Sequence, residues 1–527
     1  MSTVASELTR RPPRRVAGRL SDLIREQSAL LGDASYIEHA REDRSVSFRA
    51  LDHAVERWAV TLARADVAPG ATVGLVISDP IAFSLAFLGT IATGRWAAPL
   101  DPTTPTRGLA EAIARVQADV VFADRPLPEG LDVHWVEIEE EPTAEWAEAA
   151  TPVDVADTAG EPAGGAVLAS SGTTGVPKVV PLHQDQLLHT ARNVCTHHHL
   201  TSNDRGFNSL PLFHINAEVV GLLSSLVAGS CLVLDDRFHR TRFWDLMAER
   251  RITWINAVPA IISRLANPDD DEVVPSHIRF IRSASAPLPV ATSTRFEANT
   301  GIPVVETYGM TEAASQITSN PVGGPRKPGS VGTPVGVDVR VAADESLPAV
   351  AQAHGEASGV GHVEIRGPSV IKAYAGDHHA DRIDDEGWLR TGDLGHFDED
   401  GYLYLDSRTD DVINRGGEKV FPREIEEVLL VDPDVSAVAV VAAPDAELGQ
   451  VPVAFLVLEG VHGESDRELA ATLTARLRDR LGVALVKSKR PVTLSVMAAL
   501  PAGATGKVQR RALSTSELAV IFRLDCR

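Results

Sequence analysis

The stretch from residue 166 to residue 181, AVLASSGTTGVPKVVP, predicts two short apolar strands joined by a turn of hydroxylated residues and glycine. Lys178 follows this turn, whose small residues are Ser170, Ser171, Gly172, Thr173 and Thr174. Glycine lets backbone N–H groups approach an anion, hydroxyls add neutral donors, and lysine adds a compact positive charge. The composition therefore favours a loop that binds a polyanion, with an ordinary polar turn between two strands as the alternative.

The turn differs from a Walker loop. A Walker loop has the pattern Gly-x-x-x-x-Gly-Lys-Ser/Thr and opens a helix, whose N-terminus helps to hold the phosphate. Here Pro177 precedes Lys178, and two valines follow the lysine. The turn is therefore expected to close a hairpin, and the dipole of a helix is not expected to be the main interaction that binds the anion.

The size and charge of the chain limit what it can be. Its 527 residues are too many for one compact core, so at least two domains are expected. Hydrophobic residues make up 44% and charged residues 23%, as in an ordinary globular protein. A net charge of -22 argues against binding nucleic acid or anionic membranes, although it leaves room for a local basic pocket. Three widely spaced cysteines favour reduced thiols and a cytoplasmic location.

Neither a signal peptide nor a membrane span is indicated. Residues 1–18 lack the apolar core of a secretion signal and are expected to form a disordered leader. The longest apolar passage, residues 219–234, contains serine and glycine and is shorter than the roughly 20 residues that cross a bilayer. It predicts a buried helix followed by a core strand, and no integral membrane association.

The order of strand and helix patterns predicts the fold class. Helical spacing at residues 51–65 and 81–93 alternates with strand patterns at 73–77 and 118–122, which is typical of α/β domains with helix-covered, mainly parallel sheets. From residue 363 the strand patterns are instead antiparallel and predict a β-barrel-like subdomain, and a small mobile α+β domain follows. The expected divisions are a large N-terminal domain at 19–406, a polar hinge at 407–411 and a small C-terminal domain at 412–527.

A second motif, PVVETYGMTEAASQ at residues 303–316, is more specific than the turn. Its strand delivers the polar residues at its carboxyl end, where open α/β sheets place their ligands. Tyr308 offers a π face, Thr311 a hydroxyl group, and Glu312 a hard oxygen ligand for a cation such as Mg²⁺. These residues predict a ligand site beside the first loop.

Five motifs in order resemble the adenylate-forming superfamily, which holds acyl-CoA synthetases, luciferases and peptide-synthetase adenylation domains. They are SSGTTGVPK, ETYGMTE, Thr391-Gly392-Asp393, DSRTDD at 406–411, and Thr505-Gly506-Lys507 near the end of the chain. Members of this family activate a carboxylate with ATP to an acyl-adenylate, release pyrophosphate, and pass the acyl group to an acceptor. The resemblance covers nearly the whole chain and implies an AMP-forming acyl-CoA synthetase that uses ATP, Mg²⁺ and coenzyme A. An acyl-AMP ligase that loads a carrier protein, and a catalytically silent binding module, are the alternatives.

The resemblance also implies roles for individual residues. Lys507 is the expected catalytic lysine, acting with Thr311 and Glu312, and Glu312 and Thr174 are the expected Mg²⁺ ligands. Asp410 is the expected pivot of the hinge. Contacts to ATP and CoA are expected from Ser170, Ser171, Gly172, Thr173, Thr174, Lys178, Ser285, Ala286, Glu306, Thr307, Tyr308, Gly309, Asp393, Arg408, Gly416 and Gly417.

The acid substrate is less well determined by the sequence. Contacts to the acid are expected from His214, Asn216, Glu218, Ser283, Gly309 and Gln316. The passages around residues 211 and 319 are similar to oxalate–CoA ligases, but Ser315 stands where a histidine is expected in that group. A small dicarboxylate and a medium-chain, aromatic or natural-product acid therefore both stay open, as does a homodimer.

Two further patterns are interpreted as structural. His197, His198 and His199 cannot share one face of a helix, so they are expected to form a solvated helix end rather than a metal site. Ser369-Val370-Ile371-Lys372 matches the S-x-x-K pair of penicillin-binding-type acylases, but it lacks the accompanying Lys-Thr-Gly and is interpreted as a chance match.

Overall fold

A computed structural model describes most of the chain: residues 19–127, 133–138, 164–170, 178–344, 346–347, 349–351, 357–376, 382–501, 503, 508–513 and 520–526. The expected leader at 1–18, the loop residues Ser171, Gly172, Thr173 and Thr174, and the expected catalytic Lys507 lie outside these residues. For Ser170 the backbone is described but the side chain is not.

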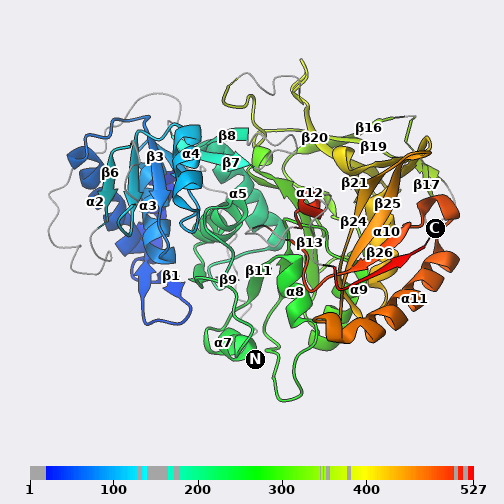
Figure 1. Ribbon diagram of the computed structural model, residues 1–527. Helices are drawn as coiled ribbons and strands as arrows, with labels where there is room; N and C mark the ends of the chain where they lie inside the picture. Colours follow the sequence, from blue (N-terminus) through cyan, green and yellow to red (C-terminus); the bar gives the residue numbers. More distant parts are fainter. Residues whose placement is uncertain are drawn as a thin grey trace, which may run out of the picture.

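The first sheet of the large domain has the strand order β6-β5-β3-β4-β7-β8 in the described part of the chain. All neighbours are parallel except β7 and β8, which pair antiparallel. Figure 1 shows this sheet in blue and cyan with its helices beside it. The bounds are β3 Thr72–Val76, β4 Trp96–Pro99, β5 Val120–Ala123, β6 Trp135–Glu137, β7 Gly165–Ser170 and β8 Lys178–His183, with α1 Leu20–Leu31, α2 Phe48–Arg64, α3 Pro80–Ala92 and α4 Thr106–Val116.

The helices of this layer begin where the sequence supplies caps. Ser47 accepts a hydrogen bond from the N–H of Ala50 at the start of α2, and Asp79 does the same for Ala82 at the start of α3. Nearly every residue of α3 is buried, because this helix packs against α1, α2 and the sheet. This burial explains why its sequence is apolar on all sides.

The second sheet has the order β15-β14-β13-β12-β11-β9-β10-β1-β2 among the described residues. Its inner strands from β13 to β1 are parallel, so their carboxyl ends lie on one edge. The strands are β1 Ser35–His39, β2 Ser45–Ser47, β9 Arg205–Asn208, β10 Cys231–Leu234, β11 Trp254–Ala257, β12 Phe280–Ser283, β13 Val304–Met310, β14 Ser315–Ser319 and β15 Thr333–Pro334. The helices are α5 Gln184–His198, the π-helix η2 Asn216–Leu223, α6 Ser224–Ala228, α7 Phe243–Glu249, α8 Pro259–Leu265, α9 Val290–Thr300 and the 3₁₀ turn η3 Thr311–Ala313.

An antiparallel sheet with the order β16-β19-β20-β21 completes the large domain in the described residues. Its strands are β16 Asp338–Ala343, β19 Gly361–Arg366, β20 Leu389–Phe397 and β21 Leu403–Arg408, and the short strands β17 Ala349–Ala351 and β18 Ala357–Gly359 pair beside it. The antiparallel region expected from residue 363 is confirmed, and the chain turns between β20 and β21 at Asp400-Gly401. The Thr391-Gly392-Asp393 motif lies within β20 and not in a turn.

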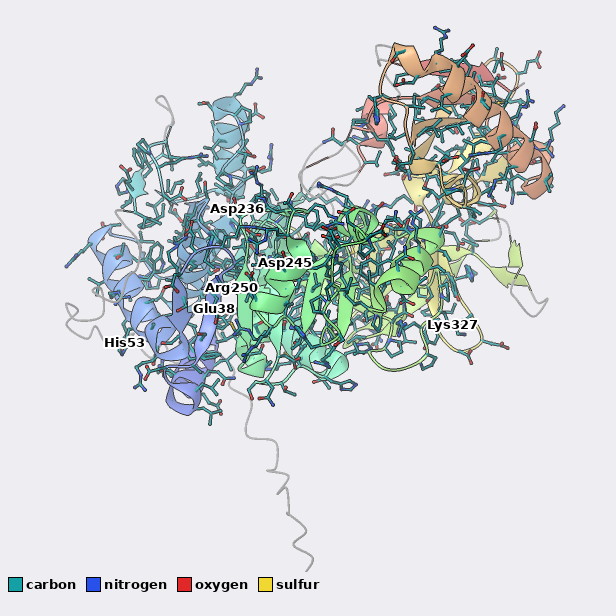
Figure 2. The ribbon with its side chains drawn as sticks, turned by 90° about the horizontal axis from the view of Figure 1, so that it is seen from below. Glu38, His53, Asp236, Asp245, Arg250 and Lys327 are labelled. Carbon is teal, nitrogen blue, oxygen red and sulfur yellow. The ribbon has the colours of Figure 1, made fainter. Side chains whose placement is uncertain are left out.

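The small domain has its own sheet and its own buried core. Figure 2 shows it as a body to one side of the large domain. The elements are β22 Ile413–Arg415, β23 Glu418–Val420, α10 Pro422–Leu430, β24 Val435–Asp445, β25 Gly449–Leu458, α11 Arg467–Ala484, η7 Lys487–Lys489, β26 Thr493–Val496, α12 Arg510–Leu513 and β27 Phe522–Asp525. The chain passes from the large-domain sheet to the small-domain sheet through the 3₁₀ turn η5, Thr409–Asp411.

The fold confirms the predicted fold class and corrects one detail. The buried helix and core strand expected at 219–234 are η2, α6 and β10. The three histidines do end α5, but His198 is fully buried edge-on against Phe280, so the expectation of a solvated end is wrong for this residue. Among the described residues, no helix combines the length and apolar character needed to cross a membrane.

Candidate active site

The end of β7 and the start of β8 border one side of the site. Ser170 pairs with Lys178 in the antiparallel register, which confirms the hairpin expected from the sequence. Lys178 is the first residue of β8, and its side chain is only 5% exposed although it carries a charge. A buried ammonium group next to a glycine-rich turn is well placed to interact with a polyanion.

A sharp chain reversal forms the second wall. β13 runs to Met310, η3 follows, and β14 returns antiparallel from Ser315. A Cβ on Gly309 would lie 1.6 Å from the carbonyl oxygen of Ser315, so only glycine fits there. Ala314 and Ser315 have φ values of 52° and 94°, in the region that glycine favours. Because of this reversal, β14, which begins in the second half of the ETYGMTEAASQ motif, pairs antiparallel with β13, which carries the first half.

Tyr308, Asp393 and Arg408 come together from three strands. Asp393 of β20 faces Arg408 of β21 in register, and the Arg408 guanidinium lies 3.0 Å from Oδ1 of the aspartate. The hydroxyl of Tyr308 donates to Oδ2 of Asp393 at 2.5 Å. Burial, together with the Asp393 charge, raises the pKa of Tyr308, so this hydroxyl stays protonated and donates. The structure thus assembles the three residues expected around the adenosine.

The carboxylate of Glu312 meets the requirements of a metal ligand. Glu312 lies in η3 and is 5% exposed. One carboxylate oxygen accepts a hydrogen bond from the hydroxyl of Tyr374 at 3.0 Å, and no described side chain is hydrogen-bonded or ion-paired to the other. A buried anionic oxygen with free acceptor capacity fits Mg²⁺.

A buried arginine, Arg282, is the main feature that the sequence analysis missed. It lies in β12, is 1% exposed, and donates to Oδ1 of Asn216 at 2.8 Å, Oδ1 of Asn256 at 3.3 Å and Oε1 of Gln316 at 3.2 Å. These partners are neutral, and no described carboxylate lies within ion-pair distance. Burial alone lowers the pKa of Arg282 to about 9. The signal in the sequence was an arginine within the apolar strand Phe280-Ile281-Arg282-Ser283.

Three polar atoms of this network are buried without a partner in the described structure: Arg282 Nε, Asn216 Nδ2 and Gln316 Nε2. Ser283 Oγ and His214 Nε2, which are not hydrogen-bonded to Arg282, are buried without a partner as well. The arginine can only donate, so the two amides must turn their oxygens toward it and leave their NH₂ groups without an acceptor. Buried donors without partners are rare in native proteins and indicate a missing ligand or water.

Glu218 is not part of this network. It lies on η2 with Asn216, but its side chain is fully buried and neither carboxylate oxygen has a hydrogen-bond partner among the described residues. Burial raises the pKa of Glu218 well above its ordinary value, and no nearby cation opposes this shift. The structure therefore gives no support for the expected contact between Glu218 and a substrate. His214 is half-buried, and desolvation lowers its pKa, although Asp101 acts in the opposite direction.

The small-residue segment after β12 borders the site. The hydroxyl of Thr307 donates to the carbonyl of Ser283 at 3.0 Å, and Ser285, which precedes Ala286, has a φ of 72°. Glu306 is buried nearby, and burial raises its pKa to about 7, with Arg423 of the small domain lowering it and Glu427 raising it. Glu306 thus lies beside the domain interface.

The expected CoA residues lie on the small domain. Gly416 and Gly417 form the turn between β22 and β23, with φ values of 59° and 94°, and both are exposed. Asp410 lies in η5 and is also exposed.

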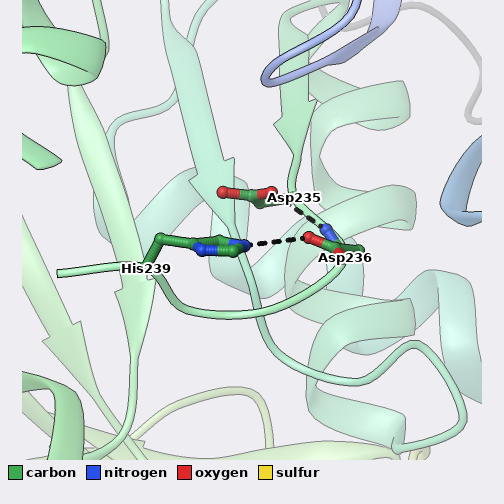
Figure 3. Close-up of side chains that lie close together, drawn as sticks. All are labelled: Asp235, Asp236 and His239. Atoms are coloured by element: carbon green, nitrogen blue, oxygen red, sulfur yellow. Dashed lines mark hydrogen bonds and ion pairs between the residues drawn. The ribbon is translucent and has the colours of Figure 1, made fainter. Parts of the chain in front are cut away.

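A second acidic cluster, Asp235, Asp236 and His239, lies at the end of β10, three strands away from β12 in the sheet order (Figure 3). Its three ligand-type atoms lie within 4.8 Å of one another. However, both oxygens of Asp235 accept from Nε of Arg41, at 2.9 and 3.2 Å. This carboxylate is therefore already paired with a cation, and Glu312 is the better metal ligand.

Comparison with known proteins identifies the family. The model of the AMP-binding enzyme family matches residues 24–375, and that of the AMP-binding enzyme C-terminal domain matches residues 424–507. The chain belongs to the AMP-binding enzyme family. It is 35% identical to the sulfoacetate–CoA ligase of Cupriavidus necator over 505 residues, which cover 93% of this chain and 96% of that protein. It is 39% identical to the oxalate–CoA ligase of Arabidopsis thaliana over 358 residues, 66% of each chain.

Solved structures agree with this assignment. The fold matches ATP-bound MatB from Rhodopseudomonas palustris with a TM-score of 0.81 and 26% identity, covering 94% of this chain and 98% of that one. It matches the MenE o-succinylbenzoate CoA synthetase of Bacillus subtilis, in complex with its acyl-adenylate, with a TM-score of 0.78, 26% identity and the same coverage. This AMP-binding enzyme belongs to the acyl-CoA ligase branch and is an AMP-forming acid–CoA ligase that uses ATP, Mg²⁺ and CoA.

The isolated carboxyl of Glu218 predicts a pH-dependent stability. The folded enzyme keeps this group protonated, whereas the unfolded chain ionises it above its ordinary pKa of 4.5. The stability that this group contributes is therefore complete at low pH and falls as pH rises, by about 1.4 kcal/mol per pH unit for one proton. We expect Glu218→Gln to raise Tm at pH 7–8, by roughly 1–2 °C for each kcal/mol recovered in a domain of this size, and to change it little near pH 4.5.

Glu364→Gln is the matched control for this measurement. Glu364 is buried too, but it accepts from Nε of Arg340 at 2.8 Å and from Nε of Arg390 at 3.3 Å. The negative charge of Glu364 is paired with these two arginines, so replacement of Glu364 by glutamine should lower Tm at pH 7. Equal Tm changes for Glu218→Gln at both pH values, in scanning calorimetry, would contradict the assignment of a protonated carboxyl.

Proposed function

We propose that this ligase activates a carboxylic acid that carries a second anionic group, and that Arg282 binds this group. The observation that carries the proposal is the buried Arg282 charge, whose described partners are all neutral amides. A charge buried without a counter-charge is unfavourable, and an anion of the substrate would offset this cost. The unpartnered NH₂ groups of Asn216 and Gln316 would donate to the same anion.

The relatives support this substrate class. Sulfoacetate and oxalate, named for two of them, each carry two acidic groups, as does the 2-succinylbenzoate of four bacterial ligases that are 30–34% identical to this chain. Ser315, which stands where a histidine is expected in oxalate–CoA ligases, directly precedes Gln316. We infer that the anion is recognised here by the arginine and two amides.

The roles of the other residues form part of the same proposal. Tyr308 would stack on adenine, Asp393 and Arg408 would hold the ribose, and the hairpin loop with Lys178 would hold the phosphates. Thr311 would donate to the α-phosphate. Mg²⁺, held by Glu312 and Thr174, would neutralise charge on the departing pyrophosphate.

Two displacements then follow. A carboxylate oxygen of the acid bonds to the α-phosphorus while the bond to pyrophosphate breaks, and the ammonium of Lys507 stabilises the negative charge that shifts between them. In the second step the small domain rotates about Asp410 and withdraws Lys507. Gly416 and Gly417 then border the path along which the CoA thiol attacks the acyl carbon and releases AMP.

A panel of acids tests the substrate class. Carboxylate-dependent ATP–pyrophosphate exchange is measured with sulfoacetate, malonate, succinate and 2-succinylbenzoate, and with propionate, butyrate and benzoate as singly charged counterparts. We expect the doubly charged acids to have the higher kcat/KM. A preference for the singly charged acids would overturn the proposal.

Substitution of Arg282 tests the residue itself. Loss of a charged hydrogen bond is worth about 1.5–3 kcal/mol, so Arg282→Met should lower kcat/KM for the best doubly charged acid by about 10–150-fold. Activity with a singly charged acid should change much less. Arg282→Lys should recover part of the loss, since it restores the charge without the planar fork. Equal losses for both kinds of acid would indicate a structural role for Arg282.

Lys507→Ala separates the two steps of the reaction. Removal of one preorganised donor costs about 10²–10³ in rate, so we expect at least this loss in pyrophosphate exchange. Transfer from chemically prepared acyl-adenylate to CoA should be nearly unaffected, because the lysine has left the site by then. A normal rate of acyl-adenylate formation in Lys507→Ala would refute the proposed first step.

A further inference from the structure

Tyr374 lies between two charged groups of the nucleotide site. Its hydroxyl donates to Oε1 of Glu312 at 3.0 Å, and Nζ of Lys178 lies over its ring, 5.1 Å from the centroid. The tyrosine itself is buried. One side chain therefore contacts the expected metal ligand through its edge and the expected phosphate-binding lysine through its face.

The segment that carries Tyr374 is fixed at three points. Gln186 of α5 donates to the carbonyls of Ser369 and Val370, at 3.4 and 2.9 Å. The N–H of Ile371 donates to the carbonyl of Glu312 at 2.9 Å. The N–H of Ala375 donates to the carbonyl of Val179 at 3.1 Å. The segment thus joins η3 to β8, and it includes the S-x-x-K match, whose Ser369 is buried.

We propose that Tyr374 is a positioning residue that holds the carboxylate of Glu312 and the ammonium of Lys178 in a fixed relation before ATP and metal bind. This inference rests on the roles proposed above for Glu312 and Lys178. The hydroxyl fixes the orientation of one carboxylate oxygen, so that the other faces the metal. The ring attracts the ammonium and so helps to fix the direction in which it points.

The chemistry of the hydroxyl supports this role. A phenol O–H can donate to a carboxylate oxygen, and an ionised carboxylate can only accept, so the two groups form a matched pair. Partners that orient metal ligands in this way typically contribute about 10–100-fold to metal affinity or activity.

Tyr402 provides a matched control elsewhere in the large domain. Its hydroxyl donates to the carbonyl of Pro325 at 2.7 Å, and Nζ of Lys327 lies 4.8 Å from its ring centroid. Figure 2 labels Lys327 beside the yellow-green strands. Tyr402→Phe removes the same kind of hydroxyl bond beneath the same kind of lysine, but Lys327 is paired with Asp398 and Asp400.

The test measures metal binding directly. Binding of Mn²⁺ to the full-length enzyme with ATP is followed by electron paramagnetic resonance, and the Mg²⁺ requirement by pyrophosphate exchange. We expect Tyr374→Phe to weaken metal binding and to raise the half-saturating Mg²⁺ concentration, each by about 10-fold. At saturating Mg²⁺ its kcat and its KM for the acid should stay near the wild-type values. Tyr374→Leu should also raise the KM for ATP, because it removes the ring beneath Lys178.

The outcomes separate this inference from the function on which it rests. Wild-type metal dependence in Tyr374→Phe, or an equal change in Tyr402→Phe, would show that the hydroxyl has only a structural role. The metal-binding measurement needs no acid, so an incorrect substrate class leaves it unaffected. Loss of metal–ATP binding in the wild-type enzyme would instead overturn the roles of Glu312 and Lys178, and with them this inference.

Discussion

The geometry of the site depends on one close approach between backbone segments. At Gly309 the strand β13 passes so close to Ser315 that any side chain would collide with the returning chain. The reversal that follows sends Tyr308 toward Asp393, Glu312 toward Tyr374 and Gln316 toward Arg282. The contacts proposed to the nucleoside, the metal and the acid therefore all start from one short segment at the carboxyl edge of the sheet. Displacement of this segment would move all three together.

A strongly acidic chain thus contains a site with three cations. Lys178 lies over a tyrosine ring, Arg282 is held by neutral amides, and the half-buried Arg408 is paired with Asp393. Arg282, whose described partners carry no charge, leaves a positive potential in a low-dielectric region, where it acts strongly on phosphate and carboxylate groups. The net charge of -22 describes the surface and says nothing about this interior field.

The sequence predicted the fold class and the motif residues, because both depend on local patterns. Strand and helix periodicity gave the α/β order, and the hairpin at Ser170 and Lys178 followed from turn composition. Contacts between distant segments were not accessible in this way. Arg282 could be seen only as an odd residue in an apolar strand, and nothing near Tyr374 in the sequence indicates Glu312 as its partner. The burial of the Glu218 carboxyl was not accessible either, because its orientation depends on how η2 packs.

The connection between the two domains is compatible with the rotation proposed for the second step. Arg423 of α10 donates to the carbonyls of Leu405 and Gly329, at 2.7 and 3.5 Å, and Glu427 accepts from the N–H of Val290 at 3.4 Å. Two of these three hydrogen bonds are long, and all of them involve backbone groups of the large domain that water could satisfy after separation. Each such bond contributes only about 0.5–3 kcal/mol net, since water replaces it. The chain passes between the two sheets through η5, and Phe421 of the small domain packs in a small apolar cluster with Val360 and Leu394 of the large domain, while each domain keeps its own hydrophobic core.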